Sequence, residues 1–307
     1  MKVTRERILL LVLLAAVLAI WGLALAGSSR HLTITVLDVG QGDSILVQSP
    51  SGKTLLIDGG GREGEQTKGY DVGKEVVLPA LLARGVRRID ALVITHPHED
   101  HIGGLAAVVE QVPVGMVLDP MLDEQSPTYQ ELRRLLQARK IPVRRATEGQ
   151  QINLGEGVGL EVLNPPDPRL SGDGADTNSN SVVMRLTYDG FSMLFAGDIE
   201  RLAATRLARL GPAVQSTVLK VPHHGSADSV GTKFLATVRP ALAAISVGRN
   251  NQFGHPSPET LEELKQARAV VMRTDEDGAI TLRVRPPHWW AKGHVGGSRA
   301  KRAAGSW

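Results

Sequence analysis

The hydrophobic pattern divides the chain into two parts. An unbroken apolar run extends from Ile8 to Ala26 and follows three basic residues. From His31 onward, apolar residues recur at the short periods that are typical of strands and amphipathic helices. We therefore expect an N-terminal segment at residues 1–30 and one folded domain at residues 31–285.

The apolar run predicts a membrane segment. At 1.5 Å per residue, a helix of this length nearly spans a hydrocarbon core. Because Lys2, Arg5 and Arg7 precede the run, the positive-inside rule places the following chain outside the cytoplasm. Ala24-Leu25-Ala26 also has the small residues of a signal-peptidase site. Both a retained membrane anchor and a cleaved signal peptide of a secreted protein fit this pattern.

The rest of the chain alternates short strands with helices. The expected strands are His31–Leu37, Ser44–Gln48, Thr54–Ile57, Ala91–Ile94, Gly115–Leu118, several in 141–163, Val182–Thr187 and Ser192–Phe195. The expected helices before the last two strands are Val72–Ala83, Ile102–Gln111 and Pro127–Arg139. Residues 164–180 are rich in Pro, Gly, Asp and Asn, which favour a loop. Helices and strands continue to about Val284, so the pattern indicates one α/β domain.

Composition narrows the chemistry. The chain has no cysteine, which excludes disulfides, Cys-ligated zinc and a thiol nucleophile. The formal net charge of +3 says little about partners. From Arg285 to the end, however, there are five Lys or Arg and no Asp or Glu. We expect residues 286–307 to be a disordered basic tail, which could alternatively contact phosphate or anionic lipid.

The sharpest chemical signal is His96-Pro97-His98-Glu99-Asp100-His101. It lies between a predicted strand and a predicted helix. Three imidazoles and a carboxylate at this spacing can converge on divalent ions, and these donors suit Zn²⁺ or Mn²⁺. A solvated polar loop is the alternative interpretation. The segment predicts a site for two metal ions.

Five further motifs occur in order along the chain. They are Asp38-Val39-Gly40-Gln41-Gly42-Asp43-Ser44, Ile57-Asp58-Gly59-Gly60, Asn178-Ser179-Asn180-Ser181-Val182, Phe195-Ala196-Gly197-Asp198 and His223-His224-Gly225-Ser226. With the HxHxDH segment, they resemble the metallo-β-lactamase superfamily, and in particular the extracellular hydrolase domain of ComEC-type competence proteins. The resemblance covers about residues 32–284 and implies an αββα four-layer sandwich with the metals at one edge of the two sheets.

The resemblance also implies a ligand set for two divalent ions, Zn or Mn. His96 and His98 would bind the first ion, Asp100 and His101 the second, Asp198 both, and His224 would complete the second. Asp198 could instead cap a helix that begins at Ile199. The order within the His223-His224 pair could also be reversed.

Other residues are expected around the ligands. Asp58 would orient the histidine loop from behind. Asn178 and Asn180 stand where many members of the superfamily have another histidine, so the first ion would have a poorer ligand shell. Lys220 would add positive charge beside the site. Asp100 or Asp198 would orient the attacking water, while His223 and His255 would face the substrate. His255 could alternatively be bound only within its own loop.

The implied function is a membrane-anchored or secreted phosphodiesterase or nuclease that acts on extracellular DNA. The residues by themselves indicate only metal-dependent hydrolysis. Competence or DNA-uptake proteins are possible partners. One alternative is a small-molecule esterase, such as a phosphocholine esterase or lactonase. The other is a non-catalytic DNA-binding partner of an uptake system.

Overall fold

The computed structural model describes residues 5, 7, 10–17, 31–61, 69–123, 126–295 and 300–307. The chain divides into two units, Met1–His31 and Leu32–Trp307. In the first unit residues 10–17 are helical, and most of the expected membrane segment lies outside the described residues. Within the described part of the chain, none of the helices combines the length and hydropathy that crossing a membrane requires.

The second unit contains a sheet of nine strands. In spatial order they are β16 (Arg302–Ser306), β15 (His288–Gly293), β14 (Ile280–Arg285), β1 (Leu32–Val36), β2 (Ile45–Gln48), β3 (Thr54–Ile57), β4 (Ala91–Val93), β5 (Val117–Asp119) and β6 (Val143–Arg145). The strands from β16 to β3 pair antiparallel, and those from β3 to β6 pair parallel.

A second sheet has seven strands. In spatial order they are β13 (Val270–Arg273), β12 (Leu242–Ile245), β11 (Val218–Lys220), β10 (Phe191–Phe195), β9 (Val183–Tyr188), β8 (Gly159–Asn164) and β7 (Gln151–Asn153). β9 and β10 form a hairpin around Asp189 and Gly190. Asp189 has a φ of 42° and Gly190 of 86°, the left-handed conformations that a type I′ turn requires.

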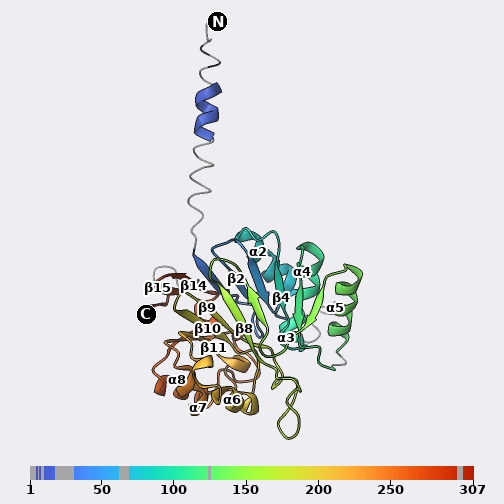
Figure 1. Ribbon diagram of the computed structural model, residues 1–307, viewed down its shortest axis with the longest axis vertical. Helices are drawn as coiled ribbons and strands as arrows, with labels where there is room; N and C mark the ends of the chain where they lie inside the picture. The colour runs from blue at the N-terminus through green and yellow to red at the C-terminus, as the bar shows by residue number, and fades with distance from the viewer. Residues whose placement is uncertain are drawn as a thin grey trace. The chain divides into compact units, whose positions relative to one another are not determined.

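Helices flank the sheets, and their bounds complete the element order. They are η2 (Gly73–Val77), α2 (Leu78–Ala83), α3 (Glu99–Ile102), α4 (Leu105–Gln111), α5 (Pro127–Ala138), α6 (Arg201–Ala208), η3 (Gly211–Val214), η4 (Pro222–Gly225), α7 (Thr232–Val238), α8 (Pro258–Gln266) and α9 (Thr274–Asp277). Figure 1 shows α2, α4 and α5 on one side of the paired sheets and α6, α7 and α8 on the other.

The alternation of side chains along the strands explains these layers. In β3, Leu55 and Ile57 enter the core between the two sheets, whereas Leu56 packs beneath α2, α4 and α5. In β10, Met193 faces the same inter-sheet core, and Leu194 packs against α6 and α7. Both faces of β3 and β10 are therefore buried, which a sheet-on-sheet core covered by helices requires. The predicted αββα sandwich is confirmed.

The helix predicted over Ile102–Gln111 divides at a pair of glycines. Gly103 and Gly104 separate α3 from α4, and the backbone of Gly104 packs against another segment. A Cβ at Gly104 would lie 2.3 Å from the carbonyl oxygen of Gly59. Glycine is therefore required at this close approach, which holds the histidine-bearing α3 against the loop that follows β3.

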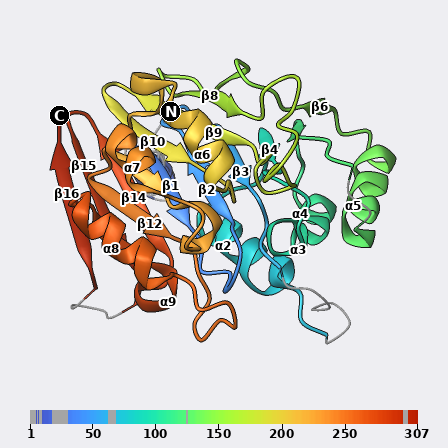
Figure 2. The same cartoon turned by 90° about the horizontal axis from the view of Figure 1, so that it is seen from below.

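The prediction of a disordered tail is wrong for the described residues after Arg285. Residues 288–293 and 302–306 are β15 and β16, and β15 pairs with β14 on one side and with β16, at the edge of the nine-stranded sheet, on the other (Figure 2). Trp289 is 3% exposed and belongs to the inter-sheet core. Burial of this indole side chain favours an ordered segment despite its basic, glycine-rich sequence.

Candidate metal centre

The predicted histidine loop follows the carboxyl end of β4. His96 is fully buried after Thr95, and His98 is the N-cap residue of α3. Asp100 and His101 lie in α3 itself. Because β4 is an inner, buried strand, its carboxyl end holds the start of this segment in a fixed position. The side chains of His96, His98, Asp100 and His101 therefore all extend from a rigid part of the backbone.

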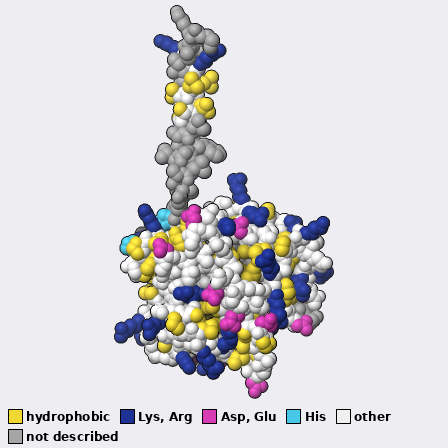
Figure 3. Space-filling view, in the orientation of Figure 1, with side chains coloured by type: hydrophobic (Ala, Val, Ile, Leu, Met, Phe, Trp, Pro, Cys, Tyr) yellow, Lys and Arg dark blue, Asp and Glu magenta, His cyan; other side chains and the backbone are white. Residues whose placement is uncertain are grey.

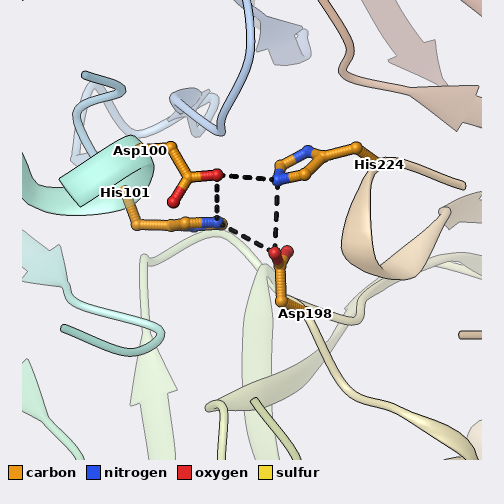
Figure 4. A group of neighbouring side chains, drawn as sticks. All are labelled: Asp100, His101, Asp198 and His224. Atoms are coloured by element: carbon orange, nitrogen blue, oxygen red, sulfur yellow. Dashed lines mark ion pairs between the residues drawn. The ribbon is translucent and has the colours of Figure 1, made fainter. Parts of the chain in front are cut away.

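Four side chains from three segments converge beside this loop. Asp100 and His101 come from α3, Asp198 from the turn after β10, and His224 from η4, as Figure 4 shows. One ligand atom from each lies within 4.8 Å of all the others. We call these four residues the metal group. His101, Asp198 and His224 are buried, and the Asp100 side chain is 30% exposed, which leaves one side open.

The distances within the metal group define a compact cluster. Asp198 Oδ2 lies 3.2 Å from Nε2 of His101 and 3.2 Å from Nε2 of His224. Asp100 Oδ2 lies 3.2 Å from Nε2 of His224 and 3.9 Å from Nε2 of His101. Both imidazoles therefore turn their Nε2 atoms toward the same two carboxylates.

The opposite ring nitrogens are already bound. His101 Nδ1 lies 2.8 Å from Asp58 Oδ2, and His224 Nδ1 donates to the carbonyl oxygen of Ser246 at 2.9 Å. By contrast, Nε2 of His101, Nε2 of His224 and Oδ1 of Asp198 are buried atoms with no hydrogen-bond partner among the described residues. Since buried polar atoms are rarely left unpaired, these three atoms fit the ligand positions of a divalent cation.

The charges of the group are strongly coupled. Burial lowers the pKa of His224, but the carboxylates around it, Asp198 first, raise that pKa to about 10. The pKa of His101 is likewise raised well above its ordinary value by surrounding carboxylates, against the effect of burial. Conversely, the two imidazoles hold the pKa of Asp198 well below its ordinary value, although burial opposes them. Without a metal ion, protons would supply the positive charge that these carboxylates require.

The predicted ligands of the first ion are close but less completely surrounded. His96 Nε2 lies 3.1 Å from His98 Nδ1, and the His96 ring centroid is 4.1 Å from that of His101. Burial, followed by the charge of His101, lowers the pKa of His96 well below its ordinary value. Neutral imidazoles are suitable ligands. However, within the described residues neither histidine belongs to a group of three or more ligand side chains that converge within 4.8 Å.

Asp58 lies behind the loop, where it was expected. Besides its contact with His101, Asp58 accepts from the backbone N–H of Thr95 at 2.8 Å and from the Thr95 hydroxyl at 2.6 Å. Its φ of 58° turns the carboxylate back toward the loop. Such a carboxylate fixes the ring orientation and tautomer of a ligating histidine.

The structure separates the roles open to the two adjacent histidines. Both have left-handed backbones, with a φ of 46° at His223 and 53° at His224. His224 enters the metal group. His223 remains 25% exposed, with Nδ1 3.5 Å from Glu200 Oε1 and its ring centroid 5.7 Å from that of His255. His224 is therefore the one placed for ligation, and His223 faces the open side.

Asn178 and Asn180, which were also expected near the ligands, make different contacts. Asn178 donates to Glu200 Oε1 at 3.1 Å and lines the cleft described below. Asn180 instead binds the backbone N–H and C=O of Leu170, which fastens its own loop. The helix-capping alternative for Asp198 is wrong, because α6 begins at Arg201 and its N-cap residue is Glu200.

A buried pair that the sequence did not reveal supports the centre. Lys220 Nζ lies 2.7 Å from Asp43 Oδ2, and both side chains are almost fully buried. Lys220 therefore neutralises Asp43 rather than adding charge to the open side. Asp43 belongs to a motif noted in the sequence, but its partner is far away along the chain. Asp43, Asp58 and His101 also converge, yet the Lys220 ammonium already satisfies the charge of Asp43.

The open side of the metal group faces a cleft of about 870 Å³. Its lining residues are Gln41, Gly61, Pro97, His98, Glu99, Asp100, Ser126, Pro127, Asn178, Asp198, His223, His224, Gly248, Arg249, Asn250, Asn251, Gln252, Phe253 and His255. Most of these side chains are polar, and few carry a charge outside the metal group. The cleft can therefore bring a polar substrate to the metal group.

Comparisons with known proteins identify the family of this chain. Residues 37–249 match the sequence profile of the metallo-beta-lactamase superfamily. ComE operon protein 3 of Bacillus subtilis is 30% identical over 258 residues, which cover 81% of this chain and 33% of that protein. Competence protein ComA of Neisseria gonorrhoeae is 31% identical over 252 residues, which cover 82% of this chain and 32% of that protein. The chain thus spans about a third of the length of these relatives, and the predicted resemblance to competence proteins is confirmed.

A solved structure shares the fold. CmlA, a diiron beta-hydroxylase from Streptomyces venezuelae, superposes with a TM-score of 0.52 and 16% identity over 83% of this chain and 54% of that chain. At this level of identity the similarity concerns the fold alone.

Proposed function

Because the chain belongs to the metallo-β-lactamase superfamily, we propose that it is a metal-dependent phosphodiesterase that acts on DNA outside the cytoplasm. The observation that carries the proposal is the metal group, which has buried ligand atoms without a hydrogen-bond partner and lies beside the cleft. The similarity to two proteins named for competence supports DNA as the substrate. Competence or DNA-uptake proteins are the partners that we propose.

The residues present would hold two divalent ions, Zn²⁺ or Mn²⁺. Asp100, His101 and His224 would hold one ion, and His96 and His98 the other, with Asp198 shared. When bound, such ions supply Lewis acidity and lower the pKa of water to about 7. Because the shell around His96 and His98 is the less complete, we propose that this ion is the more weakly held.

The chain's own side chains supply the remaining functions. The open Asp100 carboxylate can accept a hydrogen bond from the attacking water and orient it. Burial, followed by the nearby His223 and His224, lowers the pKa of His255 to about 4. His255 is therefore neutral at pH 7 and can donate a hydrogen bond to a substrate oxygen without bringing a positive charge. His223, on the same side of the cleft, can contact the same phosphate group.

The surface offers further contacts for a polyanion. On the face drawn in Figure 3, Lys and Arg side chains lie at several places and are interspersed with Asp and Glu. This face has no single basic stripe. We therefore propose that contacts in the cleft fix the position of the DNA strand, and that the scattered Lys and Arg side chains add salt-dependent affinity.

The experiment that tests this function is a substrate panel with the full-length chain. Single-stranded DNA, duplex DNA, RNA, phosphocholine esters and lactones are each incubated with added Mn²⁺ or Zn²⁺ and with a chelator. We expect divalent-dependent cleavage of DNA, with KM rising steeply as salt increases. Hydrolysis of only the small esters or lactones would favour the small-molecule alternative. DNA binding without cleavage of any substrate would favour the non-catalytic alternative.

We also propose that residues 31–307 face the exterior, either anchored by the N-terminal segment or released after its cleavage. The support is the order of basic and apolar residues before Gly27. A reporter that is active only outside the cytoplasm, fused after Trp307, should be active. Activity of a reporter that works only in the cytoplasm would contradict this location.

A further inference from the structure

One wall of the cleft is a loop that its own hydrogen bonds hold in shape. We call residues 249–255 the cleft loop. Asn251 Nδ2 donates to the carbonyl oxygens of Gly248 at 3.0 Å and His255 at 2.7 Å. Asn251 Oδ1 accepts from the backbone N–H groups of Phe253 at 3.1 Å and His255 at 3.0 Å. Asn251 thus makes three hydrogen bonds within the cleft loop and one to the adjoining Gly248, which fixes the loop before any ligand arrives.

This ordered loop presents an apolar ring to water. Phe253 is 58% exposed and lines the cleft. Most large apolar side chains of the domain are buried, because removing such surface from water is favourable. The hydrogen bonds of Asn251 hold the Phe253 backbone in place, yet the ring does not contribute to either helix-covered core. The loop therefore maintains an exposed ring beside the metal group.

The surroundings of the ring indicate the ligand. The Phe253 ring stacks on the His255 imidazole at an interplanar angle of 26° and a centroid distance of 5.7 Å. Hydrogen-bonding amides of Gln41, Asn178 and Gln252 line the same cleft. A flat apolar ring with amides nearby suits a planar heterocycle that has hydrogen-bonding edges.

A fixed cation lies on the same loop. Arg249 donates through Nε and Nη2 to the carbonyl oxygen of Asp275, at 3.2 and 3.1 Å. These two bonds hold the guanidinium group beside the cleft while the residue remains exposed. A guanidinium group in this place suits the phosphate that adjoins a nucleobase.

We propose that Phe253 is a stacking platform for a nucleobase of the substrate, with Arg249 on a neighbouring phosphate. This proposal rests on the phosphodiesterase function for its biological meaning. In a duplex, base neighbours cover both faces of a base, whereas an unpaired base can stack on a protein ring. The cleft loop therefore selects single-stranded over duplex substrate.

The test compares binding and cleavage by Phe253→Leu and Phe253→Trp in the full-length chain. Leucine keeps an apolar side chain but removes the planar face, and tryptophan keeps that face. Leu82→Ala is the control, because Leu82 is 67% exposed and lies outside the cleft lining. Binding is followed by the fluorescence of a single-stranded oligonucleotide that carries 2-aminopurine, whose emission falls when the base stacks. Cleavage is measured on the same oligonucleotide, on its duplex and on an oligonucleotide of abasic residues.

We expect Phe253→Leu to weaken binding of the 2-aminopurine oligonucleotide about tenfold, which corresponds to roughly 1.4 kcal/mol, and to abolish the fluorescence change. Phe253→Trp and Leu82→Ala should bind it as the unaltered chain does. Binding and cleavage of the abasic strand should be unchanged in all variants. Phe253→Leu should also lose the preference for single strands over duplex.

The inference is overturned if Phe253→Leu binds 2-aminopurine strands normally, or if it weakens binding of abasic strands to the same extent. These results are distinct from failure of the proposed function. If the unaltered chain cleaves no phosphodiester but still shows fluorescence quenching that depends on Phe253, the hydrolytic function is wrong and the stacking site stands.

Discussion

Lys220 and Asp43 form a buried ion pair that joins the two sheets beside the metal group. Lys220 ends β11 of the seven-stranded sheet, and Asp43 precedes β2 of the nine-stranded sheet. Their charged atoms are 2.7 Å apart, and the second carboxylate oxygen of Asp43 lies 3.6 Å from His224 Nδ1. The pair thus connects the fold directly to the position of a predicted ligand.

Breaking this pair should destabilise the protein strongly. Lys220→Met removes the ammonium group that pairs with the buried Asp43 carboxylate, and we expect the free energy of unfolding to fall by about 3–5 kcal/mol. Lys74→Met is the matched control, since Lys74 pairs with Asp71 in an exposed position and should change it by at most about 1 kcal/mol. Denaturant titrations of both variants measure the difference. Equal losses would show that the buried pair has no special role.

Asp58 should determine how tightly metal is held. Asp58→Asn keeps the shape of the side chain but weakens its hold on His101 Nδ1, so we expect metal affinity to fall by about 10- to 100-fold. Asp38→Asn, an exposed change in the same part of the chain, should leave affinity unaltered. Competition with a chelating dye measures both. An unchanged affinity in Asp58→Asn would contradict the role assigned to this carboxylate.

Metal binding should depend on pH in a defined direction. In the metal-free protein, carboxylates raise the pKa of His224 to about 10, so its imidazole is protonated at neutral pH. A cation and this proton compete for Nε2. Apparent affinity should therefore rise about tenfold per pH unit for each proton released, and should level off above the raised pKa. Calorimetric titration in buffers of different ionisation enthalpy counts the protons. Binding without proton release near pH 7 would contradict this account of the charges.

The C-terminal strands should matter for folding. Deleting residues 286–307 removes β15, β16 and the buried Trp289, so we expect a fall in melting temperature or loss of the folded domain rather than weaker DNA binding alone. A matched change, Lys301→Gln with Arg302→Gln, neutralises two exposed charges while keeping the strands. It should leave the melting temperature unchanged. A truncated chain that melts like the intact one would show these strands to be dispensable.

Much of the fold follows from local patterns. β1 lies within the strand predicted over His31–Leu37, where polar and apolar residues alternate and β-branched residues are frequent, and the hairpin at Asp189 and Gly190 follows from two turn-forming residues. The order of strands in the sheets does not follow from local patterns, because pairing joins distant segments such as β1 and β14. The tail was mispredicted for a related reason. Its charge and glycines favour disorder locally, whereas packing of Trp289 in the distant inter-sheet core favours strands.

The candidate site, too, could be predicted only in part from local sequence. His96 to His101 lie within six consecutive positions, so their spacing alone suggests convergence on metal. Asp198 and His224 could be named only through the family resemblance. The Asp43–Lys220 pair and the stacking of Phe253 on His255 depend on tertiary packing. Since buried charges require partners, the motif around Asp43 implies that a partner exists but not which residue it is.

The metal content of the purified full-length chain tests the central claim most directly. After exposure to Mn²⁺ or Zn²⁺ and removal of excess ion, elemental analysis should find about two ions per chain. Asp198→Ala should lose most of both, while Asp228→Ala, an acidic position that is 72% exposed, should retain them. Retention of no divalent ion by the unaltered chain, or equal retention by Asp198→Ala, would contradict the account.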